Sequence, residues 1–255
     1  MYHNIFDSHA HYDDEQFEKD RNELLVSFKE NGVSGVVCCG VNIPTSEFAV
    51  ELSHKYDFVY SAVGFHPLDN DEYHDGDLEK IKELAQDEKC VAIGEIGLDY
   101  HYEKESRENQ LILLEKQIQL ANELDLPVIF HDRESHEDTL NILKKYKPKG
   151  VLHCFSGSIE MAKEIIKLGM YIGLGGAVTF KNAVKPCEVA KFVPEDKLLI
   201  ETDAPYMTPV PFRGKRCDSL HIPYTAEKIA ELRGVTAQEI LDLTDRNART
   251  LFDIK

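Results

Sequence analysis

The chain has 255 residues, of which 29 are Lys or Arg and 46 are Asp or Glu, so its formal net charge is −17 with histidine neutral. Hydrophobic residues make up 42% and charged residues 29%, a composition typical of globular proteins that excludes bulk disorder. The acidic balance argues against a broad basic surface that grips nucleic acid by charge alone. Cations bound within a site reverse the sign of the charge locally, so an acidic chain can still accept a polyanion there.

The sequence carries no signal for a membrane or for secretion. No apolar run approaches the roughly 18 residues of a membrane-spanning helix, and the first seven residues (MYHNIFD) lack the basic and apolar regions of a signal peptide. The six cysteines include no C-x-x-C spacing, which predicts neither a zinc ribbon nor a disulfide framework. We therefore expect a cytoplasmic protein with reduced thiols and no membrane contact.

Eight short apolar segments recur along the chain, rich in Val and Ile and continuous rather than alternating, as in parallel strands buried on both faces. They are residues 5–6, 33–41, 58–64, 90–96, 127–130, 150–152, 170–174 and 197–200. Charged segments of helical periodicity lie between them. An apolar stripe of Leu111, Leu114, Ile118 and Ala121 predicts a helix over 103–125. Further helices are predicted over 45–56, 78–88, 134–146, 159–168, 224–233 and 236–252.

Helix boundaries are marked by capping residues. Ser158 is placed to cap the helix that follows it, Gly234 ends the penultimate helix, and Thr236 with Glu239 forms a capping box for the last one. Eight strands alternating with helices predict an α/β fold, a closed (β/α)8 TIM barrel that is a single domain over residues 1–255. The alternative is an open doubly wound sheet. The irregular stretch 204–223 is expected to form a long loop over one mouth of the barrel.

Imidazole and carboxylate side chains occur where the predicted strands end, on the face where barrel enzymes build active sites. They are His9, His11, His66, Glu95, His131, His153 and Asp203. Because residues i and i+2 of a strand point to the same side, His9 and His11 can both face the barrel axis. Without His66, this set has four imidazoles and two carboxylates. These are too many ligands for one four-coordinate ion but suffice for two ions. We therefore expect two divalent ions (Mg, Mn or Zn) on the ligands His9, His11, Glu95, His131, His153 and Asp203.

Other polar residues near the strand ends are weaker candidates. Asp7 is expected either to orient a ligating histidine or to cap a helix, Asp99 and Tyr100 to lie in a loop, and Cys154 to point away from the axis into the core. Several basic residues in the loops could meet phosphate oxygens, with a solvated loop as the alternative. These are Arg133, Lys181, Arg213, Lys215 and Arg216.

Seven motifs together are specific to one family. They are residues 7–11 (DSHAH), 64–67 (GFHP), 94–100 (GEIGLDY), 131–133 (HDR), 153–157 (HCFSG), 201–206 (ETDAPY) and 213–216 (RGKR). In these motifs the chain resembles the TatD family of metal-dependent deoxyribonucleases. The resemblance implies a TIM barrel with a two-metal centre bridged by Glu95, and a position for His66 near the substrate phosphate or an extra metal. Cys217, where the family usually has Asn, and His101–Tyr102 depart from the pattern and bear on substrate preference.

The resemblance also implies the reaction, which is hydrolysis of phosphodiester bonds in DNA, or in RNA, typically from one end. Asp203 and Glu95 are the expected catalytic residues, with Asp203 as the general base. His66, Arg133, Arg213 and Arg216 are expected to bind the substrate. One alternative is an amidohydrolase-like deacylase or esterase that uses the same centre on a carbonyl, for example on aminoacyl esters of RNA. A second is a metal-binding module without activity, which the loss of a ligand would favour; no ligand has been lost.

Overall fold

Parallel strands pair in chain order to form a barrel. The computed structural model describes residues 1–74, 76–102 and 106–255. Its strands are β1 (Ile5–Ala10), β2 (Val33–Cys39), β3 (Val59–Val63), β4 (Cys90–Asp99), β5 (Val128–Arg133), β6 (Gly150–Leu152), β7 (Tyr171–Leu174) and β8 (Leu198–Ile200). A parallel bridge joins Ala10, the last residue of β1, to Ala204, four residues after β8, and β1 also contacts β8, so the ring closes between the first and last strands. The closed barrel confirms the (β/α)8 prediction and excludes the open sheet.

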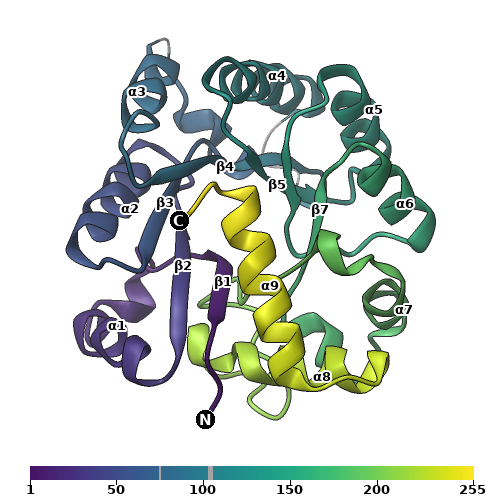
Figure 1. Ribbon diagram of the computed structural model, residues 1–255. Helices are drawn as coiled ribbons and strands as arrows, with labels where there is room; N and C mark the ends of the chain where they lie inside the picture. The colour runs from purple at the N-terminus through teal and green to yellow at the C-terminus, as the bar shows by residue number, and fades with distance from the viewer. Residues whose placement is uncertain (75, 103–105) are drawn as a thin grey trace.

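Helices surround the strands, as Figure 1 shows. They are α1 (Arg21–Glu30), α2 (Ile43–Lys55), α3 (Asp77–Leu84), α4 (Arg107–Leu124), α5 (His136–Tyr146), α6 (Ile159–Lys167), α7 (Val184–Phe192), α8 (Ile222–Arg233) and α9 (Ala237–Leu251). Short 3-10 turns lie at Glu15–Phe17, Pro67–Glu72, Gly176–Thr179, Glu195–Lys197 and Ser219–His221. In the ranges that the structure describes, no helix combines the length and the apolar character needed to span a membrane.

The predicted caps are confirmed. The Ser158 side chain accepts from the backbone N–H of Met161, Gly234 adopts a left-handed conformation after α8, and Thr236 with Glu239 forms a reciprocal capping box. Part of the helix predicted over 103–125 lies outside the described residues, namely 103–105, and α4 begins after its N-cap Ser106. Helix α3 ends at Leu84 rather than at residue 88. Helices α1 and α7 were not predicted.

The apolar interior of the barrel is closed at one end. Side chains from all eight strands, among them Phe6, Val37 and Ile129, form a buried cluster inside the barrel together with Ala248 of α9 and Phe252, the residue that caps this helix. Helix α9 therefore covers the amino-terminal end of the strands, and in Figure 1 it lies across the ring. Because that end is filled by apolar side chains, only the opposite, carboxyl end of the strands leaves room for polar groups and a ligand.

Candidate metal centre

The histidines and carboxylates that the sequence places at strand ends gather at one mouth of the barrel. His9, Glu95 and His131 lie within β1, β4 and β5, and the others follow their strands directly or by a few residues. Six of the seven candidates line one cavity of about 720 Å³, and they are His11, His66, Glu95, His131, His153 and Asp203. His9 is fully buried next to them. Residues separated by nearly 200 positions in the chain thus form a single cluster.

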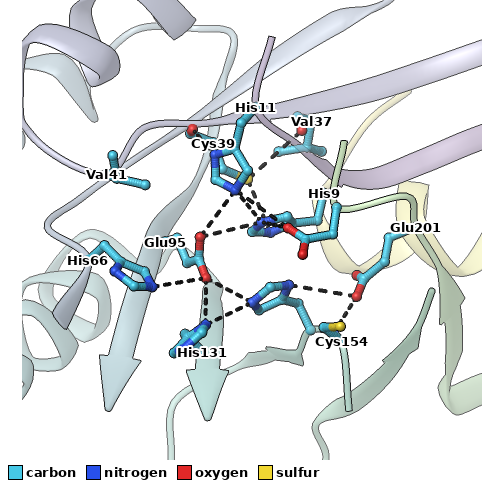
Figure 2. Close-up of polar contacts among 12 residues, drawn as sticks. His9, His11, Val37, Cys39, Val41, His66, Glu95, His131, Cys154 and Glu201 are labelled. Carbon is cyan, nitrogen blue, oxygen red and sulfur yellow. Dashed lines mark hydrogen bonds and ion pairs between the residues drawn. The ribbon is translucent and has the colours of Figure 1, made fainter. Parts of the chain in front are cut away.

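Glu95 lies at the centre of this cluster and is 3% exposed. Figure 2 shows imidazoles approaching its carboxylate from several strands. The Oε2 atom lies 3.4 Å from His9 Nε2 and 3.3 Å from His11 Nε2. The Oε1 atom lies 2.9 Å from His131 Nδ1, 2.8 Å from His153 Nε2 and 3.6 Å from His66 Nε2. One carboxylate therefore offers a different oxygen to each of two groups of imidazoles, which is the arrangement of a bridging ligand.

His9 and His11 face each other through their Nε2 atoms, which are 2.9 Å apart. The Oδ1 atom of Asp203 lies 3.5 Å from the first and 3.7 Å from the second. Two nitrogen lone pairs at this distance repel unless a proton or a cation lies near both. Burial lowers the pKa of His9 far below its usual value, whereas Glu95 and Asp203 overcome burial and raise the pKa of His11 to about 10. Besides the proton on each Nδ1 atom, the metal-free pair thus holds one additional proton at its Nε2 atoms, which a divalent cation would displace on binding.

Cys39, at the end of β2, contacts the other edge of both imidazoles. Its carbonyl oxygen accepts from His11 Nδ1 at 3.0 Å, and its Sγ atom lies 3.4 Å from His9 Nδ1 (Figure 2). Since a carbonyl can only accept, Nδ1 of His11 carries the proton and its Nε2 lone pair is free for a metal. The donor set is nitrogen and carboxylate oxygen, which suits Zn or Mn. The residues present therefore fit a divalent ion.

Three overlapping groups bring ligand atoms within 4.8 Å of one another in the part of the chain that the structure describes. They are His9 with His11 and Asp203, His9 with Glu95 and His153, and His66 with Glu95 and His131. Burial holds the pKa of Asp203 above its usual value, and the charge of Glu95 adds to this effect. The pKa of Glu95 shifts in the opposite direction. The surrounding imidazoles outweigh the effect of burial and keep the pKa of this carboxyl well below its usual range.

Two further carboxylates contact the clustered imidazoles from outside the cluster. Asp99 Oδ2 lies 3.0 Å from His131 Nε2. Glu201 is fully buried and accepts from the backbone N–H of Cys154 (Figure 2). Its Oε1 atom lies 3.7 Å from His153 Nδ1. That nitrogen is buried and has no hydrogen-bond partner in the described structure. Burial raises the pKa of Glu201 to about 7.

The sequence interpretation was wrong about two of these residues and did not single out two others. Asp99 is the last residue of β4 rather than a loop residue, because that strand extends three residues beyond its predicted end. Cys154 lines the cavity instead of packing in the core, because β6 ends at Leu152 and a positive φ of 44° at Cys154 interrupts the strand alternation. The i, i+2 rule that selected His9 and His11 would have found Glu201 beside Asp203. No sequence signal marks Cys39.

Among the described residues, Asp7 bonds to hydroxyl and backbone groups rather than to an imidazole. Its carboxylate accepts from the backbone N–H and the hydroxyl of Thr202, from Ser219 Oγ and from the backbone N–H of His9. Burial raises its pKa to about 6, although these hydrogen bonds oppose the rise. Asp7 therefore joins β1 to the segment after β8 and holds His9 through its backbone, next to the ligands.

The basic candidates lie in different surroundings. Arg133 lines the cavity, with its guanidinium 4.9 Å from the centre of the Tyr102 ring. Arg213 stacks on Phe180 at 3.7 Å. Arg216 makes two hydrogen bonds of 2.7 Å to the carboxylate of Asp20. Among the described residues that line the cavity, Arg133 is the one Arg or Lys side chain.

A comparison with protein families gives a match over almost the whole chain. The family described as TatD related DNase matches residues 6–253. The chain belongs to this TatD-related family of metal-dependent hydrolases. It is 47% identical over 253 residues to the uncharacterized metal-dependent hydrolase YabD of Bacillus subtilis, covering 98% of this chain and 99% of that protein. It is 35% identical over 259 residues to the 3'-5' ssDNA/RNA exonuclease TatD of Salmonella typhimurium, again covering 98% and 99%.

Solved structures agree with this assignment. The TatD homologue YjjV of Escherichia coli K12 superposes on the chain with a TM-score of 0.93 at 32% identity, with all of both chains covered. A TatD-family hydrolase from Entamoeba histolytica gives a TM-score of 0.88 at 24% identity, again over both whole chains, and supports the barrel fold alone. The TatD-family barrel predicted from the seven motifs is therefore confirmed.

Proposed function

We propose that this TatD-family protein hydrolyses phosphodiester bonds at an end of single-stranded DNA or RNA, using two divalent ions at the cluster around Glu95. The observation that carries the proposal is the single carboxylate shared by two sets of imidazoles within an open cavity. The relative from Salmonella named as an ssDNA/RNA exonuclease supports the choice of substrate. A cavity of about 720 Å³ is in the range that holds small organic ligands.

The residues divide into two ligand sets. His9, His11 and Asp203 would hold one ion, and His131 with His153 the other, with Glu95 between them; His66 lies next to the second set. Divalent ions such as Mg, Mn or Zn, when bound here, supply a nucleophile at neutral pH and stabilise charge on the phosphoryl oxygens. Two divalent ions would bring about four positive charges, whereas the carboxylates of Glu95 and Asp203 bring two negative ones. The occupied site would therefore be locally cationic, which offsets the acidity of the whole chain.

The side chains of the protein contribute positioning and proton transfer. Asp203 Oδ1 is directed at the His9 and His11 pair and borders the cavity, so it can take a proton from a water molecule held there. Arg133 presents its guanidinium to the same cavity and can neutralise a non-bridging phosphate oxygen. His66 Nδ1 accepts from the backbone N–H of Leu68, and burial lowers the pKa of this imidazole to about 3. The neutral ring therefore carries its proton on Nε2, which can donate a hydrogen bond to the phosphate.

Product analysis on end-labelled strands tests the proposal. Single-stranded DNA, RNA and duplex DNA labelled at either end are incubated with the purified protein and with Mg, Mn or Zn in turn. We expect stepwise shortening of the single strands from one end, dependent on an added ion and abolished by EDTA. Release of no nucleotide with any ion, together with hydrolysis of an aminoacyl ester of RNA, would instead establish the deacylase alternative.

A further inference from the structure

Two tyrosines at the rim of the metal cavity are unusually exposed for aromatic residues. Tyr102 is 49% exposed and Tyr206 is 52% exposed, and both line the cavity that contains Glu95. Tyr102 follows β4 and Tyr206 follows β8, which lie four positions apart in a ring of eight strands. The two rings therefore come from opposite sides of the barrel mouth, with the carboxylates of the centre between them.

Each tyrosine is held by an aspartate three residues before it. Asp99 Oδ1 accepts from the backbone N–H of Tyr102 at 3.3 Å, and the guanidinium of Arg133 covers one face of that ring. On the other side, the backbone N–H of Tyr206 donates to the carbonyl oxygen of Asp203 at 2.8 Å, and its hydroxyl donates to Asp14 Oδ2 at 2.9 Å. Rings anchored in this way lose little conformational entropy when a ligand packs on them.

Beyond the proposed metal centre, the cavity offers few basic side chains for holding a nucleic acid strand. With the chain at −17 and Arg133 the one Arg or Lys among the described lining residues, few phosphates can be paired with basic side chains. Proteins that bind single strands combine such pairing with stacking of the bases on aromatic side chains. Bases within a duplex already stack on one another, so only unpaired bases can use these rings.

We propose that Tyr206 and Tyr102 each stack one unpaired nucleobase, on either side of the carboxylates that hold the metal. The inference rests on the proposed nuclease function and adds the residues that recognise the bases. It assigns the preference for single strands to two rings that do not touch the ligand atoms in the described structure. Stacking uses the ring rather than the hydroxyl, so phenylalanine should preserve most of it at either position, although Tyr206→Phe loses the hydrogen bond to Asp14.

The test compares strands with and without bases. The rate constant kcat/KM is measured for release of the terminal nucleotide from a normal DNA strand and from one whose last two residues are abasic. We expect the wild type to favour the normal strand by about tenfold or more. Tyr206→Leu and Tyr102→Leu should each lose most of this preference through KM, whereas Tyr206→Phe and Tyr102→Phe should keep it.

Two controls separate recognition from chemistry and folding. Hydrolysis of the base-free substrate methyl p-nitrophenyl phosphate should be unchanged in both leucine variants, and Tyr2→Leu, before β1 at the other end of the barrel, should retain the full preference. If the wild type digests the strand and both leucine variants keep the full preference for bases, the stacking inference is overturned but the proposed function is not. A wild type that releases no nucleotide from any strand would overturn the proposed function, and the stacking inference with it.

Discussion

The Nδ1 atom of His11 donates to the carbonyl oxygen of Cys39 at 3.0 Å, and the thiol of the same cysteine lies 3.4 Å from Nδ1 of His9. A single residue of β2 therefore orients both imidazoles of the His-x-His pair. The Sγ atom also approaches the carbonyl oxygen of Val37 at 3.9 Å, so the thiol can donate there while accepting from His9. This series of hydrogen bonds leaves the Nε2 lone pairs of both imidazoles directed at the proposed metal.

Cys39→Ala should weaken metal binding without unfolding the barrel. The carbonyl that holds His11 remains, but His9 loses its partner, and loss of an outer partner of a ligand typically reduces metal affinity by about 10- to 100-fold. Titration calorimetry with Mn measures the change. Cys90→Ala, which removes a buried thiol far from the ligands, is the matched control and should bind normally. Equal affinities in the two variants would contradict the role of the Cys39 thiol.

Asp203→Asn should reduce turnover by about 10²- to 10⁴-fold while preserving the fold, because it removes the proton acceptor but few contacts. The backbone at Asp203 has a φ of 60°, a left-handed conformation that Asn tolerates as well as Asp does. Steady-state kinetics on a single strand and circular dichroism measure the two effects. The exposed Asp196→Asn serves as the control. A near-native rate in Asp203→Asn would remove this residue from the mechanism.

Glu95→Gln should lose bound metal, because the amide has no charge and only one oxygen for two sets of ligands. Elemental analysis should find fewer than two equivalents of metal per chain. Added Mn should raise the melting temperature of the wild type, since binding to the native state alone is stabilising, but should leave that of the variant almost unchanged. Glu195→Gln, at an exposed position, should behave as the wild type. Two equivalents in Glu95→Gln would refute the bridging assignment.

Arg133 and Arg216 should differ in their effect on substrate binding. Arg133→Ala should weaken binding of a single strand and lower the slope of log Kd against log salt by about 1, because one phosphate contact is lost. The guanidinium of Arg216 is already paired with Asp20 and stacks on Phe17 at 4.6 Å. We therefore expect Arg216→Ala to leave the slope unchanged and to cost about 1 kcal/mol of stability or less. A lower slope in Arg216→Ala would instead support the contact with the substrate that the sequence predicts for this residue.

Thr202→Val should destabilise the barrel where its first and last strands meet. Its hydroxyl donates to the buried carboxylate of Asp7 at 2.6 Å, and loss of that bond costs about 1–3 kcal/mol in an isosteric variant. Urea unfolding of the metal-free protein measures the free energy. Thr244→Val removes a buried hydroxyl that bonds only to carbonyls of its own helix, and should be nearly neutral. Equal stabilities of the two variants would show that Asp7 is satisfied without Thr202.

Prediction of the helices depended on how clearly each one shows an apolar stripe. Helix α4 was found because four apolar residues recur at helical spacing. Helix α1 was not predicted because its apolar residues are nearly contiguous and show no stripe. Among them, Val26 is 66% exposed while Leu25 and Phe28 are buried. Helix α7 has only two fully buried apolar residues, Val189 and Ala190, and carries Pro186 in its first turn. Burial in the tertiary structure, rather than local periodicity, stabilises these two helices.

The sequence alone determined the order of the eight strands. It also placed six side chains where those strands end, and barrel topology brings these ends to one mouth; they are His9, His11, Glu95, His131, His153 and Asp203. Which ring nitrogen faces which partner was decided only by the tertiary structure. The contacts of Cys39, Asp99 and Glu201 join different strands, and side-chain distances across a barrel depend on register and on where each strand ends. Those distances cannot be predicted from the local sequence.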